Sequence, residues 1–190
     1  MEPSDETLCD RVAAGDDRAF DALVARYQER AYRIAWSIVR DADDARDVSQ
    51  EAFLRLHRSA RRFERRARFS TWFYRILVNL ALDHRRRHRW WRRVLGGGNS
   101  GGPEAADPAP LDRLAADEVK PDEEAERREL VRRLWREVDH LSAQQRAAIL
   151  LQLDGLTTSE IAGVLDCAEA TVRVHLHRAL QALRKTVGVK

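Results

Sequence analysis

Arginine is the residue type whose concentration in this chain points most directly to a chemistry. Residues 55–93 contain 14 Arg, no Lys and two acidic residues, which gives the stretch a net charge of +12. The guanidinium group binds phosphate through two parallel hydrogen bonds, and charge of one sign collected in a block indicates a partner of the opposite sign. The block therefore predicts contact with a polyanion, most simply a nucleic acid.

The densest part of this block, residues 85–93, contains six Arg and the pair Trp90-Trp91. Arg can contact phosphates there while Trp stacks on unpaired bases. A second cationic stretch, residues 61–68, precedes it. A run of charge is often only a solvated helix face. Because few acidic residues offset the repulsion here, we favour binding to a nucleic acid.

A second candidate for nucleic-acid binding lies nearer the end of the sequence. Residues 157–160 form a capping box, which predicts the start of a short helix, and a break follows at residues 166–168. Val172 and Leu176 then mark another amphipathic helix. Such a helix-turn-helix places its second helix in the major groove of DNA. The alternative is an ordinary helical hairpin with a solvated, charged face.

Acidic residues collect at the start of a helix that is predicted to follow Asp41. The helix macrodipole favours acids at that end and explains several of them. Asp44, Asp47 and Glu51 also share one exposed face, at i, i+3 and i+7. We expect this face to bind a basic groove on a partner protein. We expect no metal site, because no His lies near in the segment, and no cofactor.

The composition excludes several classes of protein. Cys9 and Cys167 are too few for a disulfide framework or a four-Cys zinc site. The mean hydropathy is −0.56, no apolar run approaches a membrane span, and residues 1–10 lack the apolar core of a signal peptide. We therefore expect a soluble cytoplasmic protein without membrane insertion. An enzyme, such as a helical nuclease, is disfavoured because the sequence has no P-loop, nucleophile elbow or paired catalytic carboxylates.

Apolar residues recur at helical spacing in both halves of the chain, and no segment alternates as a strand would, so the predicted fold class is all-α. Residues 1–94 are predicted to form an N-terminal bundle of about four helices, with Ser70 capping the last. Residues 95–126, rich in Gly and Pro and then acidic, predict a flexible linker. Residues 127–190 are predicted to form the C-terminal helix-turn-helix domain.

Three stretches of the sequence resemble the extracytoplasmic-function (ECF, group IV) branch of the sigma-70 family. DADDARDVSQEAFLRLHRSARRF (41–63) and RFSTWFYRILVNLALDHRRRHR (68–89) resemble region 2 of these bacterial sigma factors. LSAQQRAAILLQLDGLTTSEIAGVLDCAEATVRVHLHRALQALR (141–184) resembles region 4. The resemblance covers nearly the whole chain in the right order. It implies a sigma factor that binds core RNA polymerase, recognises the promoter −10 and −35 elements and promotes DNA melting.

The resemblance assigns roles to residues of the first unit. It implies that the helix at 41–58 binds core polymerase through Asp44, Asp47, Gln50 and Glu51. The loop at 62–68 would capture a base flipped out of the −10 element, and Asn79 would help to read it, with Val78 where the family has Arg. The implied −10 residues are Arg62, Arg65, Arg66, Arg68, Asn79, Arg85, Arg86, Arg87 and Arg89.

In the second unit the resemblance implies −35 binding by residues of the last helix. The family commonly has Gly-Thr-Val-Lys/Arg-Ser-Arg where residues 170–175 here are ATVRVH. Arg173 matches the Lys or Arg of the family, whereas Val174 and His175 stand where the family has Ser and Arg. The resemblance therefore leaves the −35 sequence preference open. The implied −35 residues are Thr171, Arg173, Val174, His177 and Arg178.

The partners implied by the resemblance are the bacterial RNA polymerase core, promoter DNA and an anti-sigma factor. The alternative function is a stand-alone helix-turn-helix transcription regulator that binds duplex DNA as a dimer through residues 157–184. That regulator needs a dimer surface, and no heptad seam is visible in the sequence.

Overall fold

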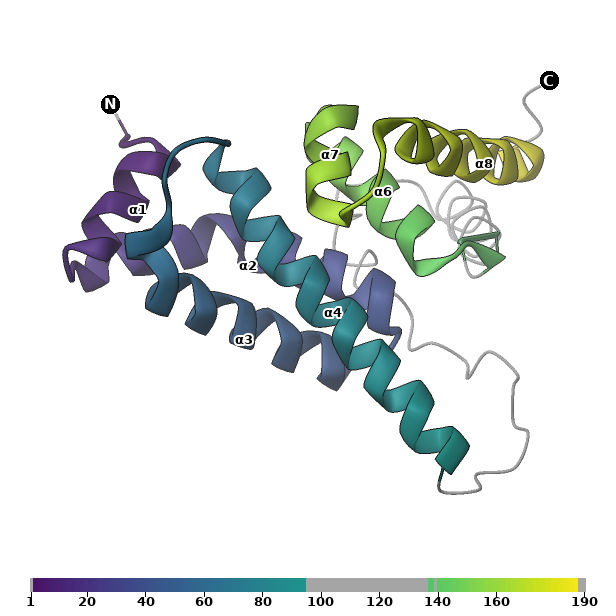
Figure 1. Ribbon diagram of the computed structural model, residues 1–190, viewed down its shortest axis with the longest axis horizontal. Coiled ribbons are helices and arrows are strands. Elements are labelled where there is room, and N and C mark those ends of the chain that lie inside the picture. The colour runs from purple at the N-terminus through teal and green to yellow at the C-terminus, as the bar shows by residue number, and fades with distance from the viewer. Residues whose placement is uncertain (1, 95–136, 139, 188–190) are drawn as a thin grey trace, which may run out of the picture.

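The computed structural model describes residues 2–94, 137, 138 and 140–187, and helices make up all of their regular structure (Figure 1). This confirms the all-α fold class. The predicted linker, residues 95–126, lies outside the described residues, so the domain boundaries remain predictions. The helices are α1 (Asp5–Ala13), α2 (Asp17–Val39), α3 (Ala42–Ser59), the short 3-10 helix η1 (Ala60–Arg62), α4 (Phe69–Val94), α6 (Ala143–Leu153), α7 (Thr158–Leu165) and α8 (Glu169–Val187).

Side-chain caps fix where most of these helices begin. Asp16 and Asp41 accept backbone N–H groups at the starts of α2 and α3, and α3 follows Asp41 as predicted. The capping box predicted at residues 157–160 is confirmed, because Thr157 with Glu160 opens α7, and Ser142 with Gln145 forms a second capping box that opens α6. Local sequence therefore determines these boundaries.

The start of α4 differs from the prediction. The helix begins at Phe69, one residue before Ser70, so Ser70 is not its cap. The N–H of Phe69, which has no partner within the first turn of the helix, is satisfied instead by a carboxylate from α1, with Glu6 Oε1 at 3.1 Å. This hydrogen bond lowers the pKa of Glu6. A contact over 63 residues of sequence separation thus replaces the expected local cap.

The core of the first unit is aromatic where α2 meets α4. The Tyr27 ring lies edge-on to Phe69 and Phe73, with centroid distances of 5.3 and 5.5 Å. Phe73 also packs on Phe53 of α3 at 4.9 Å. These rings anchor α4 on both neighbouring helices, and the C-terminal half of α4 extends past them (Figure 1).

The helix-turn-helix is formed by α7 and α8. The break between them begins at Asp166, which ends α7 with a left-handed backbone, φ 51°. Val172 and Leu176 are buried, as predicted, and hold α8 against α6 and α7. The opposite face of α8 is left in solvent.

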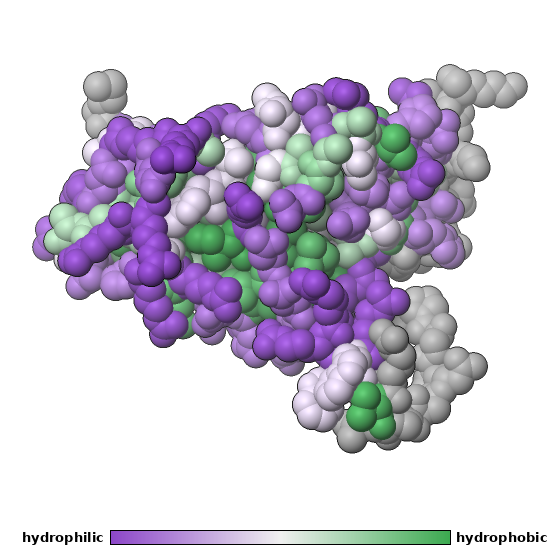
Figure 2. All heavy atoms as spheres, viewed as in Figure 1, coloured by the Kyte–Doolittle hydropathy of each residue, from purple (hydrophilic) through white to green (hydrophobic). Residues whose placement is uncertain are grey.

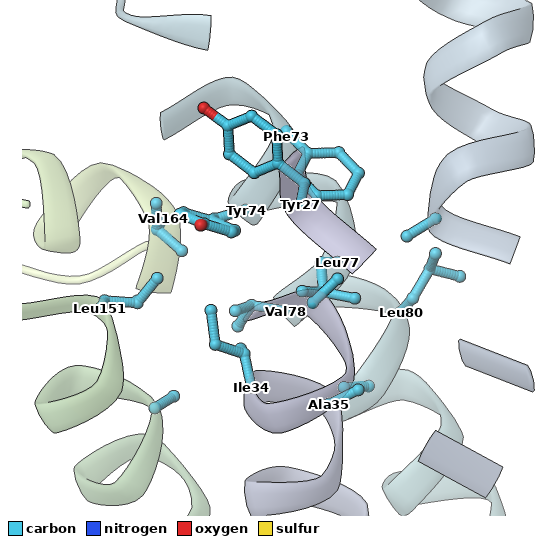
Figure 3. Packing of buried hydrophobic residues seen from close by; sticks show 14 of the residues in the cluster. Tyr27, Ile34, Ala35, Phe73, Tyr74, Leu77, Val78, Leu80, Leu151 and Val164 are labelled. Carbon is cyan, nitrogen blue, oxygen red and sulfur yellow. The ribbon is translucent and has the colours of Figure 1, made fainter. Parts of the chain in front are cut away.

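The two units pack directly on each other, which the sequence does not predict. Helices α6 and α7 lie against α2 and α4, and the two apolar cores join (Figures 1 and 3). Tyr74 and Val78 of α4 face Leu151 of α6 and Val164 of α7 in Figure 3, and all four side chains are fully buried. Burial of this apolar surface holds the units together.

Candidate nucleic-acid interface

A pocket of about 550 Å³ opens between α3, η1 and α4. Its volume is in the range of small-molecule sites, roughly 300–1,000 Å³, and is large enough for a base. Cationic side chains, one amide and one indole surround it, a combination suited to a planar base and its phosphates. The lining residues are Arg55, Arg58, Ser59, Arg62, Trp72, Arg75, Ile76 and Asn79.

The wall formed by α4 combines an apolar surface with an amide. Trp72 is braced by Phe63, with a ring centroid distance of 5.2 Å, and Ile76 follows one turn later. Asn79 is exposed and can both donate and accept hydrogen bonds. Because residues four and three apart stack on one helix face, Trp72, Ile76 and Asn79 form one stripe. The stripe can stack on a base and bond to its edge.

The wall formed by α3 and η1 is cationic. Arg62 and Arg58 are exposed, so their guanidinium groups are free to meet a phosphate. Arg55 is oriented by Glu51, whose Oε1 lies 3.0 Å from its Nε. A carboxylate assigned to polymerase binding is therefore also a neighbour of the pocket.

Two of the residues predicted for the −10 element, Arg62 and Asn79, line this pocket. The rest of the predicted loop does not enter it. Arg65 forms an ion pair with Asp10 of α1, and Arg66 lies 2.8 Å from Glu64. Arg68 approaches Glu160 of α7 at 4.0 Å. These three side chains are turned towards protein carboxylates.

Six lining residues are not among the site residues predicted from the sequence, and helices α3 and α4 bring them together. The available signal was helical spacing, because Trp72 and Ile76 precede Asn79 by seven and three residues. Helical spacing alone places Trp72 on the apolar side of α4, and its side chain is half-buried. The missed residues are Arg55, Arg58, Ser59, Trp72, Arg75 and Ile76.

The predicted cations further along α4 lie beyond the pocket. Arg87 and Arg89 are exposed, Arg85 is half-buried and Arg86 forms an ion pair with Asp83. Burial, with a smaller effect of Arg89, lowers the pKa of Arg85. This end of α4 therefore carries positive charge that the described side chains balance only in part.

The acidic face predicted on α3 lies on the surface of the first unit. Asp47 and Gln50 are exposed, and Glu51 is half-buried beside Arg55. Asp44 is half-buried and lies 3.5 Å from Nε2 of His84 on α4. Within the described ranges, no three His, Cys, Asp or Glu side chains are grouped so that they could hold a metal ion.

The predicted −35 residues lie on the solvent face of α8. Glu169 accepts hydrogen bonds from both Arg173 and Thr158 at 2.7 Å, which ties the start of α8 to α7. A DNA phosphate would therefore compete with Glu169 for Arg173. His175 is half-buried, and burial lowers its pKa. The exposed residues are Thr171, Arg173, Val174, His177 and Arg178.

Comparisons with known families agree with both halves of this geometry. Residues 23–91 match the family described as Sigma-70 region 2, and residues 132–183 match the family described as Sigma-70, region 4. The RNA polymerase sigma-H factor of Pseudomonas aeruginosa is 32% identical over 189 residues, covering 96% of this chain and 93% of that protein.

The ECF RNA polymerase sigma-E factor of Escherichia coli K12 is also 32% identical, over 97% of this chain and 94% of its own length. The chain belongs to the ECF group of the sigma-70 family. The chain is accordingly a sigma factor, a transcription initiation factor that works with RNA polymerase on promoters. Membership of this family confirms the sigma-factor function predicted from the sequence and favours that function over a stand-alone regulator.

Solved structures of sigma factors share the fold. CnrH, in complex with the cytosolic domain of CnrY, matches with a TM-score of 0.62 at 22% identity, over 99% of both chains. RpoE of Bartonella quintana, in complex with the anti-sigma factor NepR, matches with a TM-score of 0.64 at 21% identity, over 90% of this chain and 98% of RpoE. No helix in the part of this sigma factor that the structure describes is long and apolar enough to cross a membrane.

Proposed function

We propose that the pocket between α3 and α4 holds an unpaired base of the promoter −10 element. The observation that supports this best is that Asn79, Trp72 and a cationic wall surround one cavity with room for a base. Opening a duplex loses base stacking, and a pocket that stacks on and bonds to an extruded base offsets part of that cost. The sigma factor promotes melting by binding, and we infer that it catalyses no reaction.

The acidic face of α3 is proposed to dock on core polymerase through Asp44, Asp47, Gln50 and Glu51. Residues 1–54 contain 13 acidic and seven basic residues, a net charge of −6, in contrast to the +12 of residues 55–93. This separation of charge directs one surface of the unit to a basic protein groove and the other to DNA. Docking would set the pocket beside the DNA that the polymerase holds.

The exposed face of α8 is proposed to bind the −35 element as duplex. Arg173 lies near the start of the helix, the end that faces base edges in a helix-turn-helix complex. Because both units belong to one chain, binding of one raises the effective concentration of the other. Binding through this many Arg residues should weaken steeply as salt is raised.

We infer that this sigma factor acts in the cytoplasm, where transcription takes place, and that a protein regulator restrains it. The second inference is supported by the structural neighbour RpoE, which is bound to an anti-sigma factor. The regulator of this chain would compete with core polymerase or promoter DNA for the surfaces described above.

In vitro transcription tests the proposal. Purified chain and bacterial core polymerase are incubated with a genomic promoter library, and the transcription start sites are sequenced. We expect a defined set of start sites that requires the chain. Charge reversal of the α3 face, Asp47→Lys with Glu51→Lys, should abolish co-elution with the core. Start sites that do not change when the chain is added would contradict the proposal.

A further inference from the structure

Two large aromatic side chains stand exposed at the end of α4. Trp90 and Trp91 retain 53% and 52% of their accessible surface, and their ring centroids are 4.9 Å apart in an edge-to-face arrangement. Val94, on the same end of the helix, is 57% exposed. Figure 2 shows this end as a pale and green tip beside a strongly hydrophilic surface. Trp is normally highly buried, so an exposed pair indicates a binding surface.

Helix geometry places Trp90 in line with the base pocket. Trp90 follows Asn79 by 11 residues, which at 100° per residue returns to within about 20° of the same helix face. The rise of 1.5 Å per residue separates the two by about 16 Å. One uninterrupted helix therefore carries the pocket and Trp90 on the same side, with Trp91 a further 100° around the helix, and this end of α4 extends past the other described helices (Figure 1).

The surface between and around the two features is cationic. Arg86 lies on the same face and forms an ion pair with Asp83. Arg85, Arg87 and Arg89 add positive charge, and no described acidic residue follows Asp83 on α4. A nucleic-acid backbone along this face would meet guanidinium groups between two sites that can hold bases. A basic groove on a protein would instead be repelled.

We propose that Trp90 and Trp91 form a second stacking site, which binds unpaired bases of the same DNA strand whose extruded base occupies the pocket. This inference rests on the proposed function of the pocket. At about 3.4 Å per stacked nucleotide, 16 Å corresponds to about five nucleotides. Unpaired bases are the expected ligand because a duplex presents base edges and phosphates, whereas an indole ring stacks on an exposed base face.

Single-stranded DNA without a promoter sequence tests this site, since stacking on aromatic rings tolerates any base. The full chain is titrated at low salt with a fluorescent oligothymidylate of about 16 nucleotides and with an abasic sugar-phosphate oligomer of the same length and charge. We expect the wild type to prefer the oligothymidylate. Replacing both aromatic residues, Trp90→Ala with Trp91→Ala, should weaken that binding about tenfold and leave the abasic oligomer nearly unaffected.

Three matched variants separate stacking from other effects. Trp90→Phe with Trp91→Phe should retain most of the affinity, because the aromatic faces remain. Val94→Ala removes exposed apolar surface from the same end without an aromatic ring, and should bind as wild type does. Arg86→Ala should weaken the binding of both oligomers to the same extent, because phosphate contacts do not depend on bases. Circular dichroism checks that each variant folds.

Two outcomes would overturn the inference about the Trp pair without affecting the proposed function of the pocket. In the first, the double Ala variant binds oligothymidylate like the wild type while Asn79→Ala binds it more weakly. In the second, the double Ala variant loses co-elution with core polymerase but keeps its DNA affinity, which would assign the Trp pair to a protein contact. If the wild type shows no preference for bases and Asn79→Ala has no effect, the proposed function of the pocket fails as well.

Discussion

The hydroxyl of Tyr74 in α4 donates a hydrogen bond to the carboxylate of Asp154, the residue that ends α6. Arg30 of α2 lies against the same carboxylate, with 3.2 Å between Nε and Oδ1. Burial, together with the hydrogen bond to Asp154, raises the pKa of Tyr74, so its hydroxyl stays protonated and able to donate. Asp154 is thus held by both long helices of the first unit, which fixes the helix-turn-helix relative to the pocket.

Removing this hydroxyl should loosen the contact between the units. Tyr74→Phe loses one hydrogen bond to a charged group, worth about 1.5–3 kcal/mol, so the fraction of open molecules should rise by about tenfold or more. Single-molecule energy transfer between a dye on each unit measures that fraction. Tyr27→Phe is the control, because its hydroxyl bonds to Asp5 at 2.5 Å within the first unit. Equal behaviour of the two variants would argue against a specific role for Tyr74.

Arg146 makes another polar contact between the units. It is 4% exposed, and it donates to the backbone carbonyl of Ser37 and, at 2.5 Å, to that of Leu141. Arg146→Lys keeps the charge but loses the planar fork that reaches both carbonyls, so the free energy of unfolding should fall by about 1–3 kcal/mol. Thermal unfolding measures this, with the exposed Arg184→Lys as control. An unchanged Tm for Arg146→Lys would show that its buried contacts contribute little.

Features encoded by neighbouring residues could be predicted from the sequence. Asp16 and Asp41 cap the helices that follow them, and the capping boxes at residues 142–145 and 157–160 open α6 and α7. Each of these signals depends on a hydrogen bond across about three residues, so it can be recognised without knowing the fold. Helical spacing likewise places Arg173 off the face that carries Val172 and Leu176, and its side chain is exposed.

Features that depend on tertiary contacts could not be predicted. The cap of α4 comes from Glu6, and the pocket needs Arg55 and Arg58 of α3 opposite Asn79 of α4. The contact between the units leaves no periodic signal, because Tyr74 and Val78 extend an apolar stripe that already suits a helical bundle. A buried stripe shows which face is covered and leaves open what covers it.

The carboxylate of Glu6 should make the stability of the first unit depend on acid pH. Its pKa is lowered in the folded chain, mainly by the N–H of Phe69, so its contribution is present above the unfolded value near 4.5 and is lost as pH falls through the folded value. Glu6→Gln should lower the free energy of unfolding by about 1 kcal/mol at neutral pH. Below the folded pKa the difference from wild type should vanish.

Urea unfolding at a series of pH values between neutral and strongly acidic measures this dependence. Glu29→Gln, which changes an exposed side chain of α2, is the matched control and should follow the wild type throughout. If the deficit of Glu6→Gln is the same at every pH, the hydrogen bond to Phe69 does not depend on the charge of the carboxylate.

Arg173 and Glu169 should affect duplex binding in opposite directions. Arg173→Ala removes a cation from the exposed face of α8 and should weaken binding to the −35 duplex by about 1–3 kcal/mol. Glu169→Gln frees Arg173 from its 2.7 Å ion pair and removes a negative charge from the DNA-facing end, so binding should strengthen. Fluorescence anisotropy of labelled promoter duplex measures both. Equal affinities for the three proteins would exclude this end of α8 from the interface.

The most direct test of the central proposal is the rate of promoter opening by core polymerase with the Asn79→Ala chain. On a fully paired promoter the variant should open about tenfold or more slowly than wild type, because the extruded base loses a partner for its edge. On a premelted template the defect should be smaller, since the stacking cost has been removed, and Gln181→Ala, an exposed amide on α8, should match wild type on both. If Asn79→Ala opens the paired promoter at the wild-type rate, the pocket is not where the unpaired base is held.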